Sequence, residues 1–378
     1  MPSPIRVAFV IDTIAGDTSG TERQLLGLIG RLDRSRVEPY LVVLSTSEWL
    51  QSHQVACDVI VLGYSGLIKP SLVGVVSRLS TALRERKIDV VLTFFEDALF
   101  VGLIGAWWSG VHPALMQSRR DIGMGATRPW YHTLFDLARV VLADRFDAVV
   151  VNGEAVKRWV AETDGVPLSR INVIRNGVEP LGPSASKFPL PDPPGTIWFG
   201  VTANLKPIKR IDLLIEALSR LDRLVSWPWQ CVVLGEGPER SQLSRQIQQC
   251  GLATRVHLVG AVTDVASYLQ RVDVAALCSD REGLSNAILE FMTLSKPVVA
   301  TDVGSCSELV GSENGILVPP GDATALAEAL ARLGSDEGLR QRMGQVSRRR
   351  AADEFSWSRA VSEWTSLFER AMAQPSHR

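Results

Sequence analysis

The chain has 378 residues, of which 46% are apolar and 21% are charged, and its formal net charge is −1. One hydrophobic core rarely serves so long a chain, so these values predict a soluble globular protein with two domains. The near-neutral charge gives no electrostatic reason to expect a nucleic-acid partner. The five cysteines form no CxxC pair, which argues against a zinc site or a disulfide framework.

The N-terminal half alternates short apolar runs with helical patterns. Because these runs are rich in β-branched residues, they are typical of buried parallel strands with helices on both faces of the sheet. The chain begins directly on such a run, without a signal-peptide pattern, so we expect a cytoplasmic location. The expected strands span residues 5–11, 40–45, 58–63, 89–95, 114–118, 147–152 and 171–177, with helices from about residue 23 and over 72–86.

Residues 98–116 form a stretch without formal charge that carries Trp107 and Trp108. Its length is enough to span a bilayer, but Gly110 and Pro113 interrupt it. We therefore expect a buried helix followed by a buried strand. Because tryptophan favours membrane interfaces, the pair also suggests a peripheral contact with lipid headgroups at the inner face of the membrane.

The composition changes at residues 179–195, which contain too many prolines for the interior of a helix or strand. This segment predicts an interdomain linker between an N-terminal domain, residues 1–178, and a second domain, residues 196–355. Both domains are expected to be doubly wound parallel sheets, and residues 356–378 an amphipathic helix. The strands of the second domain are expected near residues 196–205, 229–235, 255–260, 273–279, 297–302 and 315–320.

The most informative segment is DREGLSNAILE, residues 280–290, which runs from a strand through a turn into a helix. The first N–H groups of a helix have no intrahelical partner, and the helix dipole adds positive charge there, so an anion or a hydroxyl-rich ligand is favoured. Glu282 would stand at this site, and Glu290 offers two acceptor oxygens for a vicinal diol such as a ribose. The alternative is a pair of solvated helix-terminal acids. The N–H groups in question belong to Leu284, Ser285 and Asn286.

A cluster of cations, Lys206, Lys209 and Arg210, lies between an expected strand and the helix that follows it. Cations at a helix N-terminus oppose the dipole, so three of them need a compensating partner. An anionic ligand such as a diphosphate would supply it. A solvated charge cluster is the alternative.

Two glycine-bearing loops also follow expected strands: one contains Gly20, and the other places Gly235 beside Glu236. Glycine lets backbone approach a ligand closely, although tight surface turns use the same pattern. No Asp-x-Asp motif occurs in the chain, so a metal ion that bridges two phosphates is not expected. Lys209, its basic neighbours and backbone N–H groups would then meet the phosphate charge, without a cofactor.

The order of these motifs resembles the retaining family 4 glycosyltransferases over nearly the whole chain. The matching segments are GTERQLLGLI, VVNGEAVKRWV, VIRNGVE, KPIKR, GEGPER, EGLSNAILE, KPVVATDVGSCSELV and GILVPPGD. The resemblance implies the α/β GT-B fold, in which two doubly wound Rossmann-like domains face a central cleft. It also implies an acceptor-side N-terminal domain, onto which the C-terminal helix packs.

Site residues follow from the resemblance position by position. Glu282 would contact the donor sugar, Glu290 would hold the nucleotide ribose, and Lys209 would bind the diphosphate. The loop with Gly20 would approach the phosphate, and Glu236, next to Gly235, would lie beside the nucleobase and ribose. Backbone N–H groups to the sugar or diphosphate would come from Leu284, Ser285 and Asn286.

Two positions depart from the family pattern. Members usually carry an arginine where this chain has Asn204, which leaves Lys206 and Arg210 as candidates for the second cation. Many members also place a histidine after the strand at residues 114–118, where this chain reads SRRDIG. We expect Arg120 and Asp121 to face the cleft there, with a structural ion pair as the alternative.

The resemblance implies retaining transfer of a sugar from a nucleotide-sugar donor, with UDP favoured over GDP, to a hydroxyl of a glycan or lipid-linked acceptor. Polysaccharide or glycolipid assembly is the implied setting. The sequence offers no carboxylate that can be assigned as a covalent nucleophile, which favours front-face attack. A nucleotide-sugar epimerase or hydrolase, or a non-catalytic sugar-nucleotide-binding protein, are the alternatives, and the intact Glu282 and Glu290 favour catalysis.

Overall fold

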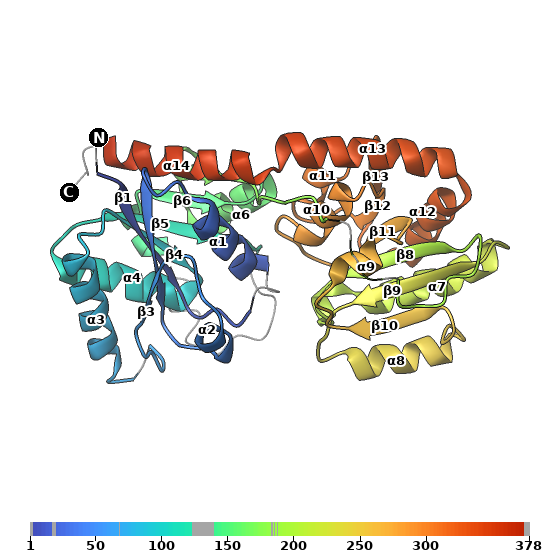
Figure 1. Cartoon of the computed structure of the whole chain (residues 1–378), viewed down its shortest axis with the longest axis horizontal. Helices are drawn as coiled ribbons and strands as arrows, with labels where there is room; N and C mark the ends of the chain where they lie inside the picture. Colours follow the sequence, from blue (N-terminus) through green and yellow to red (C-terminus); the bar gives the residue numbers. More distant parts are fainter. Residues whose placement is uncertain are drawn as a thin grey trace. The chain divides into compact units, whose positions relative to one another are not determined.

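The chain divides into two compact units, Met1–Gly177 together with Trp357–Arg378, and Val178–Ser356. The computed structural model describes residues 3–16, 20–67, 69–122, 140–182, 184, 186 and 188–373. Each unit is a parallel β-sheet with helices on both faces (Figure 1), which confirms the predicted pair of doubly wound α/β domains. The proline-rich residues 179–195 belong to the second unit.

The sheet of the first unit has seven parallel strands within the described residues, in the order β3-β2-β1-β4-β5-β6-β7. Successive side chains of β1 point to opposite faces: Phe9 packs in the core under α1 and α14, and Val10 in the core under α3 and α4. Both faces are therefore buried, as expected for a parallel sheet. The strands are β1 Ile5–Ile11, β2 Val37–Val43, β3 Asp58–Val61, β4 Val90–Phe94, β5 Ala114–Arg119, β6 Ala148–Val151 and β7 Ile171–Val173.

The C-terminal helix α14 completes the core of the first unit. Its apolar stripe, which includes Trp364 and Phe368, is buried against β1 and α1. At its first residue, the Trp357 ring occupies the space that a Cβ at Gly27 or Gly177 would need, so both glycines make this packing possible. Helices of this unit within the described residues include α1 Gly20–Arg31, α2 Glu48–Ser52, α3 Leu72–Glu85, α4 Glu96–Ser109, α6 Glu154–Asp164 and α14 Trp357–Ala373, with short 3-10 turns at Ala143–Arg145 and Leu168–Arg170.

Helix α4 and strand β5 confirm the predicted division of the long uncharged stretch into a helix and a strand. The helix ends at Gly110, whose φ of 68° suits glycine. The helix is buried on one side only, because Trp107 and Trp108 are 78% and 51% exposed. Helix α4 is apolar nearly all round, but only one side packs on α3 and the sheet. Among the described residues no helix is both long and apolar enough to cross a membrane.

The sheet of the second unit has six parallel strands within the described residues, in the order β10-β9-β8-β11-β12-β13. Strand β8 alternates in the same way, with Phe199 in the core under α7, α8 and α12, and Trp198 in the core under α10. The strands are β8 Ile197–Thr202, β9 Trp229–Leu234, β10 Val256–Gly260, β11 Val274–Leu277, β12 Val298–Thr301 and β13 Gly315–Val318.

Several helices of the second unit begin at polar caps that the sequence supplies. Asp322 accepts the backbone N–H groups at the start of α12, and Asp336 does so for α13. The helices are α7 Ile211–Leu224, α8 Arg240–Gln249, α9 Val265–Leu269, α10 Asn286–Thr293, α11 Cys306–Leu309, α12 Ala323–Ser335 and α13 Glu337–Glu354, with a 3-10 turn, η3, at Pro207–Lys209.

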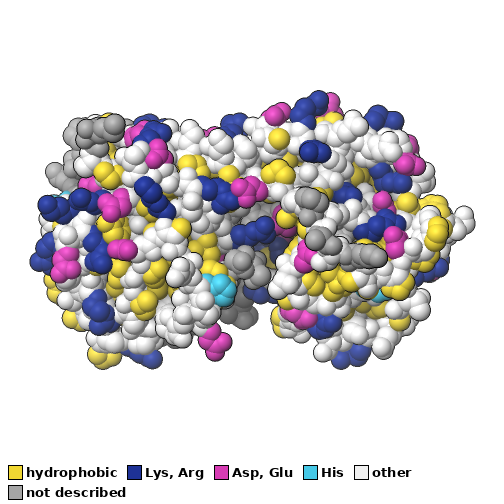
Figure 2. All heavy atoms as spheres, in the orientation of Figure 1, with side chains coloured by type: hydrophobic (Ala, Val, Ile, Leu, Met, Phe, Trp, Pro, Cys, Tyr) yellow, Lys and Arg dark blue, Asp and Glu magenta, His cyan; other side chains and the backbone are white. Residues whose placement is uncertain are grey.

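The visible surface carries both signs of charge. Figure 2 shows Lys and Arg interspersed with Asp and Glu over this face, in keeping with the formal net charge of −1. Electrostatic specificity must therefore come from individual side chains at strand ends rather than from a field of one sign.

Candidate functional site

Lys209 and Glu282 meet at the switch point of the second sheet. The chain passes from β8 through β9 to β10 on one side and then returns to β11 on the other side of β8, and ligands of such sheets bind where the order reverses. Lys209 ends the η3 turn that follows β8, and Glu282 lies in the loop that follows β11. The Lys209 Nζ lies 2.5 Å from the Glu282 Oε1, and the glutamate side chain is only 10% exposed.

Ser279 also bonds the Glu282 carboxylate, at the oxygen that Lys209 contacts. Its hydroxyl donates to the Glu282 Oε1 at 2.6 Å, and its own carbonyl accepts from the Thr301 hydroxyl at 2.7 Å. Nearby, burial raises the pKa of the Cys306 thiol to about 12, and the charge of Glu282 adds to this rise. Sequence reasoning missed Ser279, although a hydroxyl three residues before a turn carboxylate is a readable signal for such a bond.

Helix α10 begins next to this ion pair. Ser285 caps the helix, since its side chain accepts from the Ile288 N–H at 3.4 Å. Leu284 and Ser285 are buried, and Asn286 is half-buried as the first helical residue. Glu290 lies in the same helix and is 5% exposed. The residues predicted from DREGLSNAILE therefore form one turn and one helix start, with the positive end of the helix dipole at the ion pair.

Protein carboxylates already compensate part of the predicted cation cluster. Arg210, with a φ of 49°, bonds the Asp212 and Asp280 carboxylates at 3.0 Å each. The bond to Asp212, followed by that to Asp280, raises the pKa of Arg210. Lys206 and Asn204 are exposed. Of the two candidates for a second cation, Arg210 is thus committed to two aspartates.

The loop after β9 lies against the loop after β8. The Leu205 N–H donates to the Glu236 carbonyl at 2.9 Å, and a Cβ at Gly235 would collide with the Ala203 carbonyl. Gly235 also has a φ of 136°, which favours glycine. The Glu236 side chain is exposed and lies 2.9 Å from the Arg240 guanidinium.

In the first unit, Gly20 is the exposed first residue of α1. The glycine loop before it is partly held by the helix itself, since the Glu22 carboxylate accepts from the Ala15 N–H at 2.9 Å and the Gly16 N–H at 3.0 Å. Residues 17–19 of this loop lie outside the described residues. The Gly16 N–H of this loop is therefore engaged by a protein carboxylate.

The switch point of the first sheet, between β1 and β4, carries acids. Asp12 follows β1 and accepts the Ala98 N–H at the start of α4 at 2.9 Å. Asp97 accepts from the Tyr64 hydroxyl at 2.7 Å. Burial, followed by the charge of Asp97, raises the pKa of Asp12 to about 7. Sequence reasoning gave no role to these residues.

The two arginines at the end of β5 have different surroundings. Arg119 forms a buried ion pair with Asp164, 3.1 Å apart. Arg120 instead donates to the Asn176 Oδ1 at 2.6 Å and to the Ser118 Oγ at 3.2 Å. Asp121 is exposed. The alternative expected for Arg120 was a structural ion pair. In the structure Arg119, not Arg120, forms such a pair.

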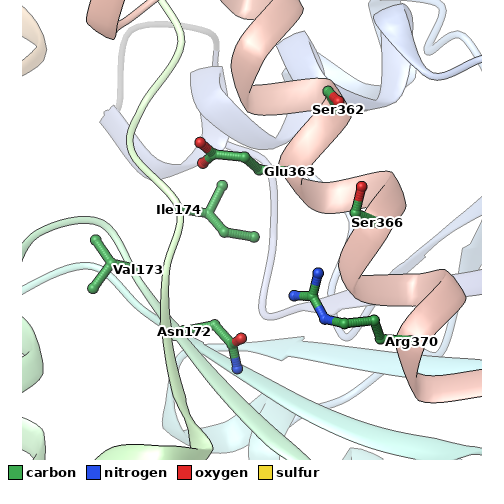
Figure 3. A pocket seen from close by; sticks show the side chains of 7 residues that line it. All are labelled: Asn172, Val173, Ile174, Ser362, Glu363, Ser366 and Arg370. Atoms are coloured by element: carbon green, nitrogen blue, oxygen red, sulfur yellow. The ribbon is translucent and has the colours of Figure 1, made fainter.

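A separate pocket of about 280 Å³ opens between β7 and α14 in the first unit (Figure 3). None of the predicted site residues lines it. In the described part of the chain, no group of three or more His, Cys, Asp or Glu side chains is placed to hold a metal ion. The pocket is lined by Asn172, Val173, Ile174, Ser362, Glu363, Ser366 and Arg370.

Two doubly wound parallel-sheet domains with the nucleotide-binding type of switch point define the GT-B glycosyltransferase fold. Comparison with solved structures supports this class. The structure of Anabaena HepE in complex with UDP and glucose superposes with a TM-score of 0.79, is 22% identical in sequence, and covers 98% of this chain and 100% of its own.

Family models match both halves of the chain. The model described as Glycosyltransferase Family 4 matches residues 18–180, and that described as Glycosyl transferases group 1 matches residues 185–350. The chain belongs to this glycosyltransferase family, which confirms the resemblance found in the sequence.

Curated relatives share part of the chain. An exopolysaccharide phosphotransferase of Streptomyces coelicolor is 30% identical over 240 residues, which are 61% of this chain and 24% of that protein. Glycogen synthase of Mycobacterium tuberculosis is 25% identical over 297 residues, 76% of this chain and 68% of its own. The alignment thus spans about a quarter of the first relative and about two thirds of the second.

Proposed function

We propose that this protein transfers a sugar, with retention of its anomeric configuration, from a nucleotide-sugar donor to a hydroxyl of a glycan or lipid-linked acceptor. The observation that carries the proposal is the Lys209–Glu282 pair at the switch point of the second sheet, 2.5 Å apart and beside the start of α10. A cation and a helix N-terminus together suit a diphosphate, and a carboxylate among them suits sugar hydroxyls.

The chemical step needs stabilisation of the departing diphosphate. Lys209 and the positive end of α10 are fixed before the reaction, so they stabilise the developing charge without further reorganisation. Lys209 and Ser279 both bond the Glu282 Oε1, so the Lys209 ammonium can be shared with a bound diphosphate while the second carboxylate oxygen of Glu282 accepts from a sugar hydroxyl. Front-face attack, in which the leaving phosphate takes the acceptor proton, needs no further protein base.

The residues that we propose to bind the donor nucleotide also lie in the second unit. Buried Glu290 would accept hydrogen bonds from the two ribose hydroxyls. Exposed Lys206 is the better candidate for a second diphosphate cation, because Arg210 already bonds Asp212 and Asp280. UDP is the favoured nucleotide, since HepE, with the same fold, was solved with UDP and glucose.

The acceptor assignment rests on the relatives. Their names, an exopolysaccharide phosphotransferase and a glycogen synthase, fit a role in polysaccharide assembly. A lipid-linked acceptor would fit the exposed Trp107 and Trp108 of α4, since tryptophan rings favour the headgroup region.

We expect the double variant Trp107→Ala/Trp108→Ala to lose sedimentation with anionic vesicles, while Trp49→Ala, in a different helix of the same unit, does not. Equal sedimentation of both variants would exclude this contact.

A donor panel tests the proposed reaction. The protein is incubated with UDP-, GDP- and ADP-sugars, with and without glycan and lipid acceptors, and the released nucleotide and the anomeric configuration of the product are measured. Glu282→Gln is the test variant and Glu328→Gln, an exposed glutamate on α12, is its matched control. We expect acceptor-dependent release of UDP with a retained anomer, lost only in the Glu282 variant.

Other outcomes identify the alternatives. Isomerised donor without nucleotide release indicates an epimerase, and release that does not depend on an acceptor indicates a hydrolase. Binding of the donor without turnover, under every acceptor condition, indicates a non-catalytic sugar-nucleotide-binding protein. A glycosyl adduct on a protein side chain would overturn front-face attack.

A further inference from the structure

The positively charged Arg120 guanidinium is surrounded by a cage of neutral groups: two aromatic rings, an amide and a hydroxyl. The residue follows β5 at the carboxyl edge of the first sheet. Its guanidinium lies over the rings of Phe94 and Trp364, about 6 Å from each centroid. Its two hydrogen bonds within the described residues go to the uncharged side chains of Asn176 and Ser118. The guanidinium has five N–H donors, so most of its donor capacity is not used by these two bonds.

Arg119, the preceding residue, is an arginine whose charge is compensated within the fold. Arg119 points toward α6, where its guanidinium pairs with Asp164 and lies over the Trp159 ring. Arg120 points toward α14 and has no carboxylate within ion-pair distance in the part of the chain that the structure describes. The same strand end therefore carries one compensated and one uncompensated guanidinium.

Burial of an uncompensated charge is unfavourable for folding. Guanidinium stays protonated at any physiological pH, and drawing a half-buried charge such as that of Arg120 partly out of water without a counterion disfavours the folded state. The effect is visible as a pKa of Arg120 lowered to about 10 by burial, with no carboxylate offsetting it. The two aromatic faces, the Asn176 amide oxygen and the Ser118 hydroxyl hold the guanidinium in place but do not neutralise it.

We propose that Arg120 binds an oxyanion, a phosphate or a carboxylate, carried by the acceptor substrate. This inference rests on the proposed glycosyl transfer and specifies its acceptor. The planar fork of a guanidinium matches such groups with two parallel hydrogen bonds. Arg120 belongs to the first unit, whereas Lys209 and the start of α10, which suit the donor diphosphate, belong to the second. The acceptor anion would supply the counterion that the fold leaves out.

Calorimetric titration with inorganic phosphate tests the site. The full-length protein is first saturated with UDP, so that the anion site of the second unit is filled, and phosphate is then added against chloride at constant ionic strength. We expect saturable binding to the wild type, weakened about tenfold or more in Arg120→Met and in Arg120→Gln. Arg170→Met, which removes a surface arginine of the same unit, should leave the affinity within about threefold.

Three results would overturn the proposal. The first is a wild-type protein that does not bind phosphate beyond chloride, and the second is unchanged phosphate affinity in both Arg120 variants. The third is an equal loss of UDP and phosphate affinity in Arg120→Met, which would place this cation in the donor site. Retained UDP affinity shows that the variants are folded. If the wild type binds no UDP, the proposed function fails, and a phosphate titration of Lys209→Met then tests the Arg120 site alone.

Steady-state inhibition assigns the anion to the acceptor. With the acceptor identified by the donor panel, phosphate should compete with the acceptor and not with the nucleotide sugar in wild-type protein. The Arg120→Met variant should raise the KM for the acceptor about tenfold and change the KM for the donor by less than about threefold. Competition with the donor instead of the acceptor would contradict the assignment. A matched acceptor pair with and without its phosphate or carboxylate identifies which group is bound.

Discussion

The two units have the same doubly wound topology but opposite chemistry where their strand order reverses. In the second unit, the loops after β8 and β11 bring Lys209 to Glu282 beside the start of α10. In the first unit, the loops after β1 and β4 bring Asp12 to the start of α4, next to Asp97. The second switch point therefore suits an anion, whereas the first repels one. The sheet topology determines where a ligand can bind, and a few loop side chains determine which charge the ligand must carry.

The comparison also explains where positive charge stands in the first unit. With its switch point occupied by acids, that unit places its cation beyond β5, one strand further along the sheet than β4. There Arg120 lies among neutral groups.

Removing the carboxylate charge at the second switch point should abolish most turnover. We expect Glu282→Gln to lower kcat about 100- to 1,000-fold, comparable to losing one preorganised group at a charged transition state, with donor affinity nearly unchanged. Acceptor-dependent nucleotide release measures the effect, and Glu328→Gln is the control. If kcat is retained, Glu282 has no role in the chemical step.

The two arginines after β5 should differ in their effect on stability. Arg119→Met leaves Asp164 without its guanidinium in the interior and should lower the free energy of unfolding by about 3 kcal/mol. Arg120→Met removes a charge that has no counterion among the described residues, and it should leave stability unchanged or increase it. Urea unfolding of both variants measures the difference. A larger loss for the Arg120 variant would mean that its cage is a structural requirement.

The acidic switch point should make stability depend on pH. The folded pKa of Asp12, about 7, lies above its ordinary value of 3.8, so the folded state binds more protons between these values. Its contribution to stability is therefore present at low pH and is lost as the pH rises through this window. We expect Asp12→Asn, which still accepts the Ala98 N–H, to be more stable than wild type near pH 8 by roughly 1 to 2 kcal/mol and equal to it near pH 4.

The urea midpoint across this pH range measures the effect. Asp58→Asn, an exposed aspartate at the edge strand β3, is the control. Parallel pH profiles for wild type and the Asp12 variant would show that folding does not raise the pKa of Asp12.

The smallest effect is expected at the ribose. Glu290→Ala should weaken UDP binding about tenfold, close to 1.4 kcal/mol, because one side chain that accepts from two hydroxyls is lost. Calorimetric titration with UDP measures the affinity, and Glu290→Gln separates the loss of charge from the loss of volume at this buried position. Unchanged affinity in the alanine variant would remove Glu290 from the donor site.

The sequence predicted much of the second unit because its signals are local. Apolar β-branched runs and the starts of α7 and α10 at Ile211 and Asn286 depend on neighbouring residues alone. Motif order also placed Lys209 and Glu282 after strands that proved to be neighbours in the sheet. The sequence by itself therefore determined the fold class and the family, and it predicted a donor-type site in the C-terminal half.

Tertiary structure alone decided how the charges are paired. Nothing in the spacing of SRRDIG shows that Arg119 takes Asp164 as its partner while Arg120 faces Trp364, because those partners come from α6 and α14, far along the chain. In the same way, folding brings Asp280 to Arg210, and buries Asp12 next to Asp97. Charge compensation depends on distances between strand ends, which the order of residues along the chain does not contain.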